Sequence, residues 1–97
     1  MKPVVVIPTY NEKENIRELI PAINKLGLGC DILVVDDNSP DGTGVLVDEF
    51  ARNNEYVHVL HRKEKEGLGK AYIAGFTWAL ERAYDPIVEM DADCSQD

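Results

Sequence analysis

The sequence predicts an α/β fold in three layers, with helices on both faces of a mostly parallel sheet of four strands. Short runs of β-branched residues, typical of strands buried on both faces, alternate along the chain with longer segments whose apolar residues recur at helical spacing. Polar and ionisable residues follow the end of every predicted strand, where open parallel sheets bind their ligands. Since such a ligand crevice forms where the direction of the crossovers reverses, we expect the strand order 3-2-1-4.

The chain begins with a predicted strand and helix. Residues 3–7 form a continuous β-branched run, which Pro8 should end. Residues 14–26 place apolar side chains on one face of a helix and charged side chains on the other. Pro21 lacks the N–H that one helical hydrogen bond needs, so a kink is expected there. Gly27 tolerates a left-handed backbone and is expected to end the helix.

The second strand and helix follow the same order. Residues 31–36 form the strand, with four apolar residues between two aspartates. Residues 37–44 are rich in Asp, Asn, Ser, Pro and Gly, which favour turns. Either Asp41 or Thr43 is expected to cap a helix that runs to about Asn53.

Two further strands enclose a third helix. Residues 56–60 form the third strand, and residues 61–69 form a charged loop interrupted by glycines. The helix predicted over residues 70–83 carries small residues that allow close packing on the sheet. Pro86 precedes the fourth strand, which is predicted over residues 87–90.

Composition and charge exclude several classes of protein. Ten Lys and Arg against 18 Asp and Glu give a net charge of −8, which disfavours binding to nucleic acid or to an anionic membrane through the overall field. No apolar stretch approaches the roughly 20 residues of a membrane span. Cys30 and Cys94 lack metal-ligand spacing and are too few for a disulfide scaffold, so reduced thiols and a cytoplasmic location are expected. Residues 1–97 contain no linker and are interpreted as one domain.

Acidic residues stand at the ends of the second and fourth predicted strands. Asp91 and Asp93 can turn toward one cation, and their carboxylate oxygens suit Mg²⁺ or Mn²⁺. An isolated pair of this kind is more often a solvated turn, but the other carboxylates at the same edge favour a metal. Turn and capping chemistry explains the polar residues that follow Asp36 and Asp37, but not two adjacent acids. One of these two is expected to accept hydrogen bonds from a ribose or a base.

Two loops add aromatic and basic groups to this edge. Tyr10 offers a ring on which a nucleobase can stack, and Glu12 lies beside it in the sequence. An equally good interpretation of Glu12 is a favourable charge at a helix N-terminus. Residues 67–70 read Gly-Leu-Gly-Lys but lack the first glycine and the Ser or Thr of a P-loop, so they are interpreted as the flexible start of a helix that can bind an anion. Lys70 and Arg62 could add positive charge near phosphates.

Four ordered segments carry most of these residues. They read P-T-Y-N-E from Pro8, V-V-D-D-N-S-P-D-G-T from Val34, G-L-G-K-A-Y-I-A-G-F from Gly67 and M-D-A-D from Met90. Together they resemble the family 2 glycosyltransferases of the GT-A fold, over nearly the whole chain. The closest group is similar to the dolichol-phosphate mannosyltransferases and related polyprenyl-phosphate glycosyltransferases.

The resemblance implies a nucleotide-sugar donor, often GDP-mannose, bound with Mg²⁺ or Mn²⁺, and an inverting transfer to a polyprenyl phosphate. The positions that match the nucleotide-sugar pocket are Pro8, Tyr10, Glu12, Val35, Asp37, Asp91, Ala92 and Asp93. Among them, Asp93 matches the principal metal ligand, and Asp91 matches a position close to the metal. No residue of this chain is matched to a catalytic base.

The sequence departs from the family pattern after Asp93. The family commonly continues D-A-D-L-S-H, whereas Cys94 here replaces Leu and Gln96 replaces His. The acceptor-binding half and the basic residues that clamp the diphosphate in longer relatives are absent, so we expect this chain to bind the donor without transferring sugar. We also expect residues 87–90 to form an exposed edge through which two copies associate, and a longer protein to work at the cytosolic face of a membrane.

The alternative is a non-catalytic nucleotide-binding or receiver-like signalling module. Receiver domains also carry paired acids and a lysine at the carboxyl ends of parallel strands. In that fold, the paired acids follow the first strand, and the phosphorylated aspartate ends the third. Here the pair Asp36 and Asp37 comes after the second predicted strand, and His61 and Arg62 come after the third, so the glycosyltransferase interpretation is favoured.

Overall fold

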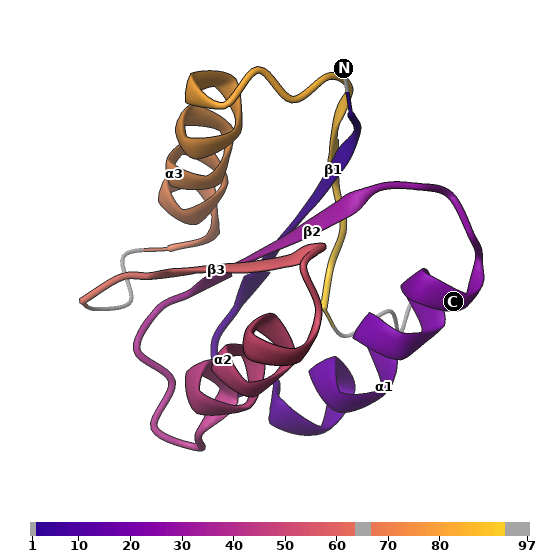
Figure 1. Cartoon of the computed structure of the whole chain (residues 1–97). Coiled ribbons are helices and arrows are strands. Elements are labelled where there is room, and N and C mark those ends of the chain that lie inside the picture. Colours follow the sequence, from indigo (N-terminus) through magenta and orange to yellow (C-terminus); the bar gives the residue numbers. More distant parts are fainter. Residues whose placement is uncertain (1, 64–66, 93–97) are drawn as a thin grey trace.

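The computed structural model describes residues 2–63 and 67–92, which form a sheet of four parallel strands in the order β3-β2-β1-β4 (Figure 1). The predicted fold class and strand order are therefore confirmed. The strands are β1 (Val4–Thr9), β2 (Asp31–Asp36), β3 (Val57–His61) and β4 (Ile87–Glu89). The helices are α1 (Lys13–Lys25), α2 (Thr43–Asn53) and α3 (Leu68–Glu81).

Helices α1 and α2 pack on one face of the sheet and α3 packs on the other, which gives the three predicted layers (Figure 1). Alternate strand residues enter opposite cores, as the two-residue period of a strand requires. The core beneath α1 and α2 contains Val5, Ile7, Ile16, Ile20, Ile23, Ile32, Val34, Val47, Val57 and Ala92. The core beneath α3 contains Val4, Val6, Leu33, Val35, Ala71 and Ala79.

Strand β1 runs past Pro8, so the expectation that this proline ends the strand is wrong. Alternate residues of a parallel strand direct their N–H and C=O groups to opposite neighbours. The Val4 N–H donates to the Pro86 carbonyl at 3.1 Å, and the Val6 carbonyl accepts from the Met90 N–H at 3.0 Å, so both residues face β4. The nitrogen of Pro8, two residues after Val6, also faces the side of β4. Pro8 lies beyond the last residue that pairs with β4, so its missing N–H removes no hydrogen bond of the sheet.

The starts and ends of the helices differ slightly from the predicted ones. The Asp41 carboxylate accepts the N–H of Thr43 at 2.9 Å, so Asp41 satisfies one of the free N–H groups at the start of α2. Helix α3 spans Leu68–Glu81 instead of residues 70–83. It ends early because Ala83 has a φ of 62°, outside the right-handed helical region.

Helix α3 approaches the sheet closely at Gly75. A Cβ atom at this position would lie 2.5 Å from Val6 Cγ1 and 3.1 Å from Val35 Cγ2. The small residues predicted to allow close packing therefore do so at this position.

In the part of the chain that the structure describes, no helix has the length and apolar character to cross a bilayer.

Candidate functional site

All four strands are parallel, so their carboxyl ends lie at one edge of the sheet, which we call the carboxyl edge (Figure 1). The crossovers through α1 and α2 run along one face, and the crossover through α3 returns along the other to place β4 beside β1. The topological switch point lies between β1 and β4, which is where open α/β sheets bind ligands.

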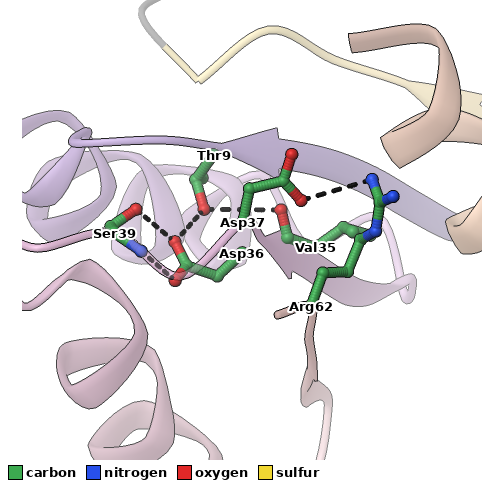
Figure 2. Close-up of polar contacts among 6 residues, drawn as sticks. All are labelled: Thr9, Val35, Asp36, Asp37, Ser39 and Arg62. Atoms are coloured by element: carbon green, nitrogen blue, oxygen red, sulfur yellow. Dashed lines mark hydrogen bonds and ion pairs between the residues drawn. The ribbon is translucent and has the colours of Figure 1, made fainter. Parts of the chain in front are cut away.

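Asp36 ends β2 and is almost completely buried, with 2% of its surface exposed. Its carboxylate accepts hydrogen bonds from the Thr9 hydroxyl at 2.7 Å, the Ser39 hydroxyl at 2.6 Å and the Ser39 N–H at 3.0 Å (Figure 2). These three donors compensate for the cost of burying the charge. Asp36 therefore joins the end of β1 to the loop that follows β2, and its carboxylate does not face a ligand crevice.

Asp37, the second member of the acidic pair, is also buried, with 4% of its surface exposed. Its carboxylate points toward the guanidinium of Arg62, whose Nη1 lies 3.3 Å from Oδ1 (Figure 2). Arg62 follows β3 directly, and its side chain pairs with Asp37; the expectation that it adds positive charge near phosphates stays a prediction. The sequence could not reveal this pair, because the two residues are 25 positions apart.

The loops after β1 and β2 are joined by further hydrogen bonds. The Asn11 N–H donates to the Ser39 hydroxyl at 2.9 Å, and the Asp41 N–H donates to Asn11 Oδ1 at 3.2 Å. The Glu12 N–H donates to the Thr43 hydroxyl at 3.1 Å. Asn11 has a φ of 56°, a conformation that asparagine tolerates better than most residues. The two loops thus form one connected surface at the carboxyl edge.

The predicted pocket residues of β1 and β2 lie at this edge. Pro8 and Val35 are register partners and both are buried, so they can form only the floor of a pocket. Tyr10 has 37% of its surface exposed, which leaves the ring accessible for stacking. Glu12 is half-buried, and its carboxylate accepts a hydrogen bond from Asn15 Nδ2 at 3.0 Å.

The acidic segment after β4 lies beside the end of β1. Val6 pairs with Glu89 and its carbonyl accepts the Met90 N–H, so Asp91 directly follows the last residue that is hydrogen-bonded to β1. Asp91 is exposed, whereas Ala92 is buried in the core beneath α1 and α2. Asp93, the predicted principal metal ligand, lies outside the described residues.

Asp91 also affects a neighbouring tyrosine. Burial raises the pKa of Tyr72, and the negative charges of Asp91 and Glu89 raise it further.

The carboxylate chemistry of this segment fits a hard divalent cation, because Mg²⁺ and Mn²⁺ prefer oxygen ligands. Within residues 2–63 and 67–92, no group of three or more His, Cys, Asp or Glu side chains forms a ready metal site. Such cations often keep several waters and take oxygens from a substrate's phosphates, so one or two carboxylates suffice. Asp91 and Asp93 would hold the cation.

Comparison with known proteins agrees with the geometry. A family model described as glycosyl transferase family 2 matches residues 4–96. The chain belongs to this family. Membership in it disfavours the receiver-like alternative, which the position of the acidic pair at the end of β2 already opposed.

Curated relatives of the family act on lipid phosphates, according to their names. The chain is 53% identical over 95 residues to a polyprenol monophosphomannose synthase of Mycolicibacterium smegmatis, covering 97% of this chain and 36% of the relative. It is 54% identical over 95 residues to an undecaprenyl-phosphate mannosyltransferase of Micrococcus luteus, covering 98% of this chain and 39% of the relative. The chain therefore spans well under half the length of these relatives.

A solved structure shares the fold. The mannosyltransferase PcManGT from Pyrobaculum calidifontis, in complex with GDP-Man and Mn²⁺, aligns with a TM-score of 0.77 and 28% sequence identity. The alignment covers 95% of this chain and 27% of that structure. The fold described above is therefore the fold of the corresponding part of a GT-A glycosyltransferase.

Proposed function

We propose that this chain is the nucleotide-sugar-binding part of a polyprenyl-phosphate mannosyltransferase that uses GDP-mannose as its donor. The observation that carries the proposal is the position of the predicted pocket residues. Tyr10, Asp37 and Asp91 follow the ends of three different strands, β1, β2 and β4, whose carboxyl ends share one edge of the sheet. The similarity to mannosyltransferases with lipid-phosphate acceptors supports this choice of substrates.

In the proposed donor complex, each group of residues has a separate task. The exposed ring of Tyr10 stacks on the base, above the floor formed by Pro8 and Val35. Asp37 accepts hydrogen bonds from the base or the ribose. Asp91 and Asp93 hold Mg²⁺ or Mn²⁺ at the diphosphate, where the cation supplies Lewis-acid stabilisation of the leaving group's charge.

The proposed reaction is an inverting displacement at the anomeric carbon of mannose. A lipid phosphate is an anion at neutral pH and can attack without a general base, provided that it is held opposite the diphosphate. The loops after β1 and β2, joined by the hydrogen bonds of Asn11 to Ser39 and Asp41, keep the donor in place. With a lipid acceptor, we place the full reaction at the cytosolic face of a membrane.

Donor binding is the decisive experiment. The melting temperature of the chain is measured with GDP and with UDP, each with and without Mn²⁺ or Mg²⁺. Because a ligand that binds only the folded state stabilises it by mass action, GDP with metal at about 100 times its Kd should raise the melting temperature by about 10 °C or more. An unchanged melting temperature with both nucleotides and both metals would rule out the proposal.

We also propose that two copies of this chain associate through β4. In the described residues, β4 pairs on one side only, with β1, and Val88 leaves 43% of its surface exposed. An unpaired strand edge is a template for another chain. Sedimentation at increasing concentration should show a dimer for the natural sequence and a weaker one for Val88→Lys, while a monomer at every concentration would contradict this.

A further inference from the structure

We propose that Arg62 is a positioning residue for nucleoside recognition, acting through Asp37 and not through the phosphates of the donor. The inference rests on the proposed function, because it concerns the same pocket. It adds a role for a residue that neither stacks on the base nor holds the metal.

The backbones of both residues are fixed to the sheet. The Arg62 N–H donates to the Asp36 carbonyl at 2.8 Å, and the Asp37 N–H donates to the Thr9 carbonyl at 3.1 Å. With the two backbones held in this way, the orientation of the Asp37 carboxylate depends on its side-chain partners. The contact between Arg62 Nη1 and Asp37 Oδ1 at 3.3 Å is one of them (Figure 2).

Burial makes this contact important for the charge of Asp37. The side chain of Asp37 is 5% exposed and that of Arg62 is 15% exposed, so water screens the pair poorly. A buried carboxylate that loses a cationic partner is less stable as a fixed charge, which favours its turning toward water or taking up a proton. Either change removes the fixed, ionised acceptor that the proposed nucleoside contact requires.

The contact of the guanidinium with Asp37 favours this role over direct phosphate binding. Arg62 reaches toward the end of β2, where Asp37 lies, whereas the proposed diphosphate site lies at Asp91, beyond β1 in the strand order (Figure 2). Two strands therefore separate the end of β3, which carries Arg62, from β4.

The test compares the binding of two probes in the presence of Mn²⁺, GDP and inorganic pyrophosphate, by calorimetry on the chain. The variants are Arg62→Met, Arg62→Lys, Asp37→Asn and the Arg62→Met/Asp37→Asn double variant. Arg17→Met is the matched control, because Arg17 forms an exposed ion pair with Glu14 on α1. Thermal unfolding of each variant verifies that it is folded at the temperature of the titration.

We expect Arg62→Met to weaken GDP binding about tenfold or more while leaving pyrophosphate binding unchanged. Arg62→Lys should restore part of the loss, because a lysine keeps the charge but not the planar fork of the guanidinium. If Arg62 acts through Asp37, adding Arg62→Met to Asp37→Asn should cost little more, since residues in one contact are not additive.

Other results would overturn the inference. Equal losses for GDP and pyrophosphate would make Arg62 a phosphate ligand, and additive losses in the double variant would make the two residues independent. If Arg62→Met does not fold, Arg62→Gln, which also removes the charge, takes its place, and undiminished GDP binding by the folded Arg62→Gln variant would reject the inference. If the natural chain binds neither probe, both the proposed function and the inference are rejected. Normal GDP binding by Arg62→Met rejects the inference but leaves the proposed function standing.

Discussion

Strand β2 begins and ends with a buried aspartate, and the two carboxylates are held in different ways. Asp36, at the carboxyl edge, is bound by hydroxyl and N–H groups of the neighbouring loops. Asp31, at the opposite or amino edge, contacts the Lys2 ammonium at 3.3 Å, His58 Nε2 at 3.0 Å and the Tyr84 hydroxyl, which donates at 2.6 Å. The partners of Asp36 lie in the loops of the candidate site, whereas those of Asp31 lie where strands and helices begin or end.

The amino edge is further closed by aromatic rings. Trp78 and Tyr84 stack with ring centroids 5.7 Å apart, and the guanidinium of Arg82 lies 4.1 Å above the Trp78 ring. Burial opposes ionisation of Asp31, but hydrogen bonds from Tyr84, His58 and Lys2 outweigh it, so the pKa of Asp31 lies below its usual value. The same residue type thus serves fold stability at one edge and loop placement beside the candidate site at the other.

The largest effect is expected for Asp36→Ala. The substitution leaves the buried Thr9 hydroxyl and the Ser39 N–H without their acceptor, at a cost of about 2–4 kcal/mol of unfolding free energy. GDP binding should weaken as well, because the loops after β1 and β2 lose their common anchor. Urea unfolding and GDP titration measure the two effects, with the exposed Glu18→Ala as control. A stable variant with normal GDP affinity would show that the carboxyl edge does not depend on this carboxylate.

Asp31→Asn should destabilise the fold without affecting the site. Loss of the charge that pairs with Lys2 and His58 should cost about 1–2 kcal/mol, while the Tyr84 hydroxyl keeps an acceptor. GDP affinity should stay unchanged, because the amino edge lies at the other end of the sheet. Weaker GDP binding at a temperature where the variant is folded would mean that the two edges are energetically linked.

Among the predicted donor-binding residues, Asp37→Asn and Asp93→Asn should separate nucleoside binding from metal binding. Asp37→Asn is expected to weaken GDP binding by about tenfold with or without Mn²⁺, because the lost contact is to the base or ribose. Asp93→Asn should weaken only the metal-dependent part of the affinity. Titrations with Mn²⁺ and with a chelator measure both, and identical losses in chelator would contradict this division of roles.

A smaller effect at the amino edge should appear at alkaline pH. Burial and the adjacent Asp31 carboxylate raise the pKa of Tyr84 to about 12, compared with 10.0 for the unperturbed side chain. The folded state therefore holds the phenolic proton more tightly, so this stabilisation is complete below pH 10 and is lost as the pH rises toward 12. Urea unfolding between pH 8 and 12 should show this loss for the natural sequence, and Tyr84→Phe should reduce it.

The smallest effect is expected away from both edges. Arg17 and Glu14 form an exposed ion pair at 2.8 Å on α1. Arg17→Met should change the unfolding free energy by no more than about 0.5 kcal/mol, because such pairs are screened by water. A larger loss would indicate that an exposed ion pair on α1 contributes to stability as much as the buried contacts at the two edges of the sheet do.

The sequence predicted the strands and their order because runs such as residues 32–35 are apolar throughout, as strands of a sheet covered on both faces are. It also placed Tyr10, Asp37 and Asp91 at one edge, since parallel strands end together. Side-chain partners could not be predicted, because the pair of Arg62 and Asp37 forms only in the folded chain.

The amino edge was also missed. Nothing in the sequence distinguishes Asp31 from an ordinary strand boundary, although Tyr84, 53 residues away, donates to it. The end of β1 was misjudged because the role of Pro8 depends on where β4 stops pairing. These features all depend on contacts between distant segments, which local patterns do not encode.

The hydrogen bonds of Asn11 to Ser39 and Asp41 have a consequence for how the donor specificity of this chain can be changed. A loop taken from a relative brings its own length and its own hydrogen-bonding side chains. If only the loop after β1 is exchanged, its new residues cannot form the hydrogen bonds that Asn11 forms with Ser39 and Asp41. Under the proposed function, we therefore expect donor preference to transfer only when both loops are taken from the same relative.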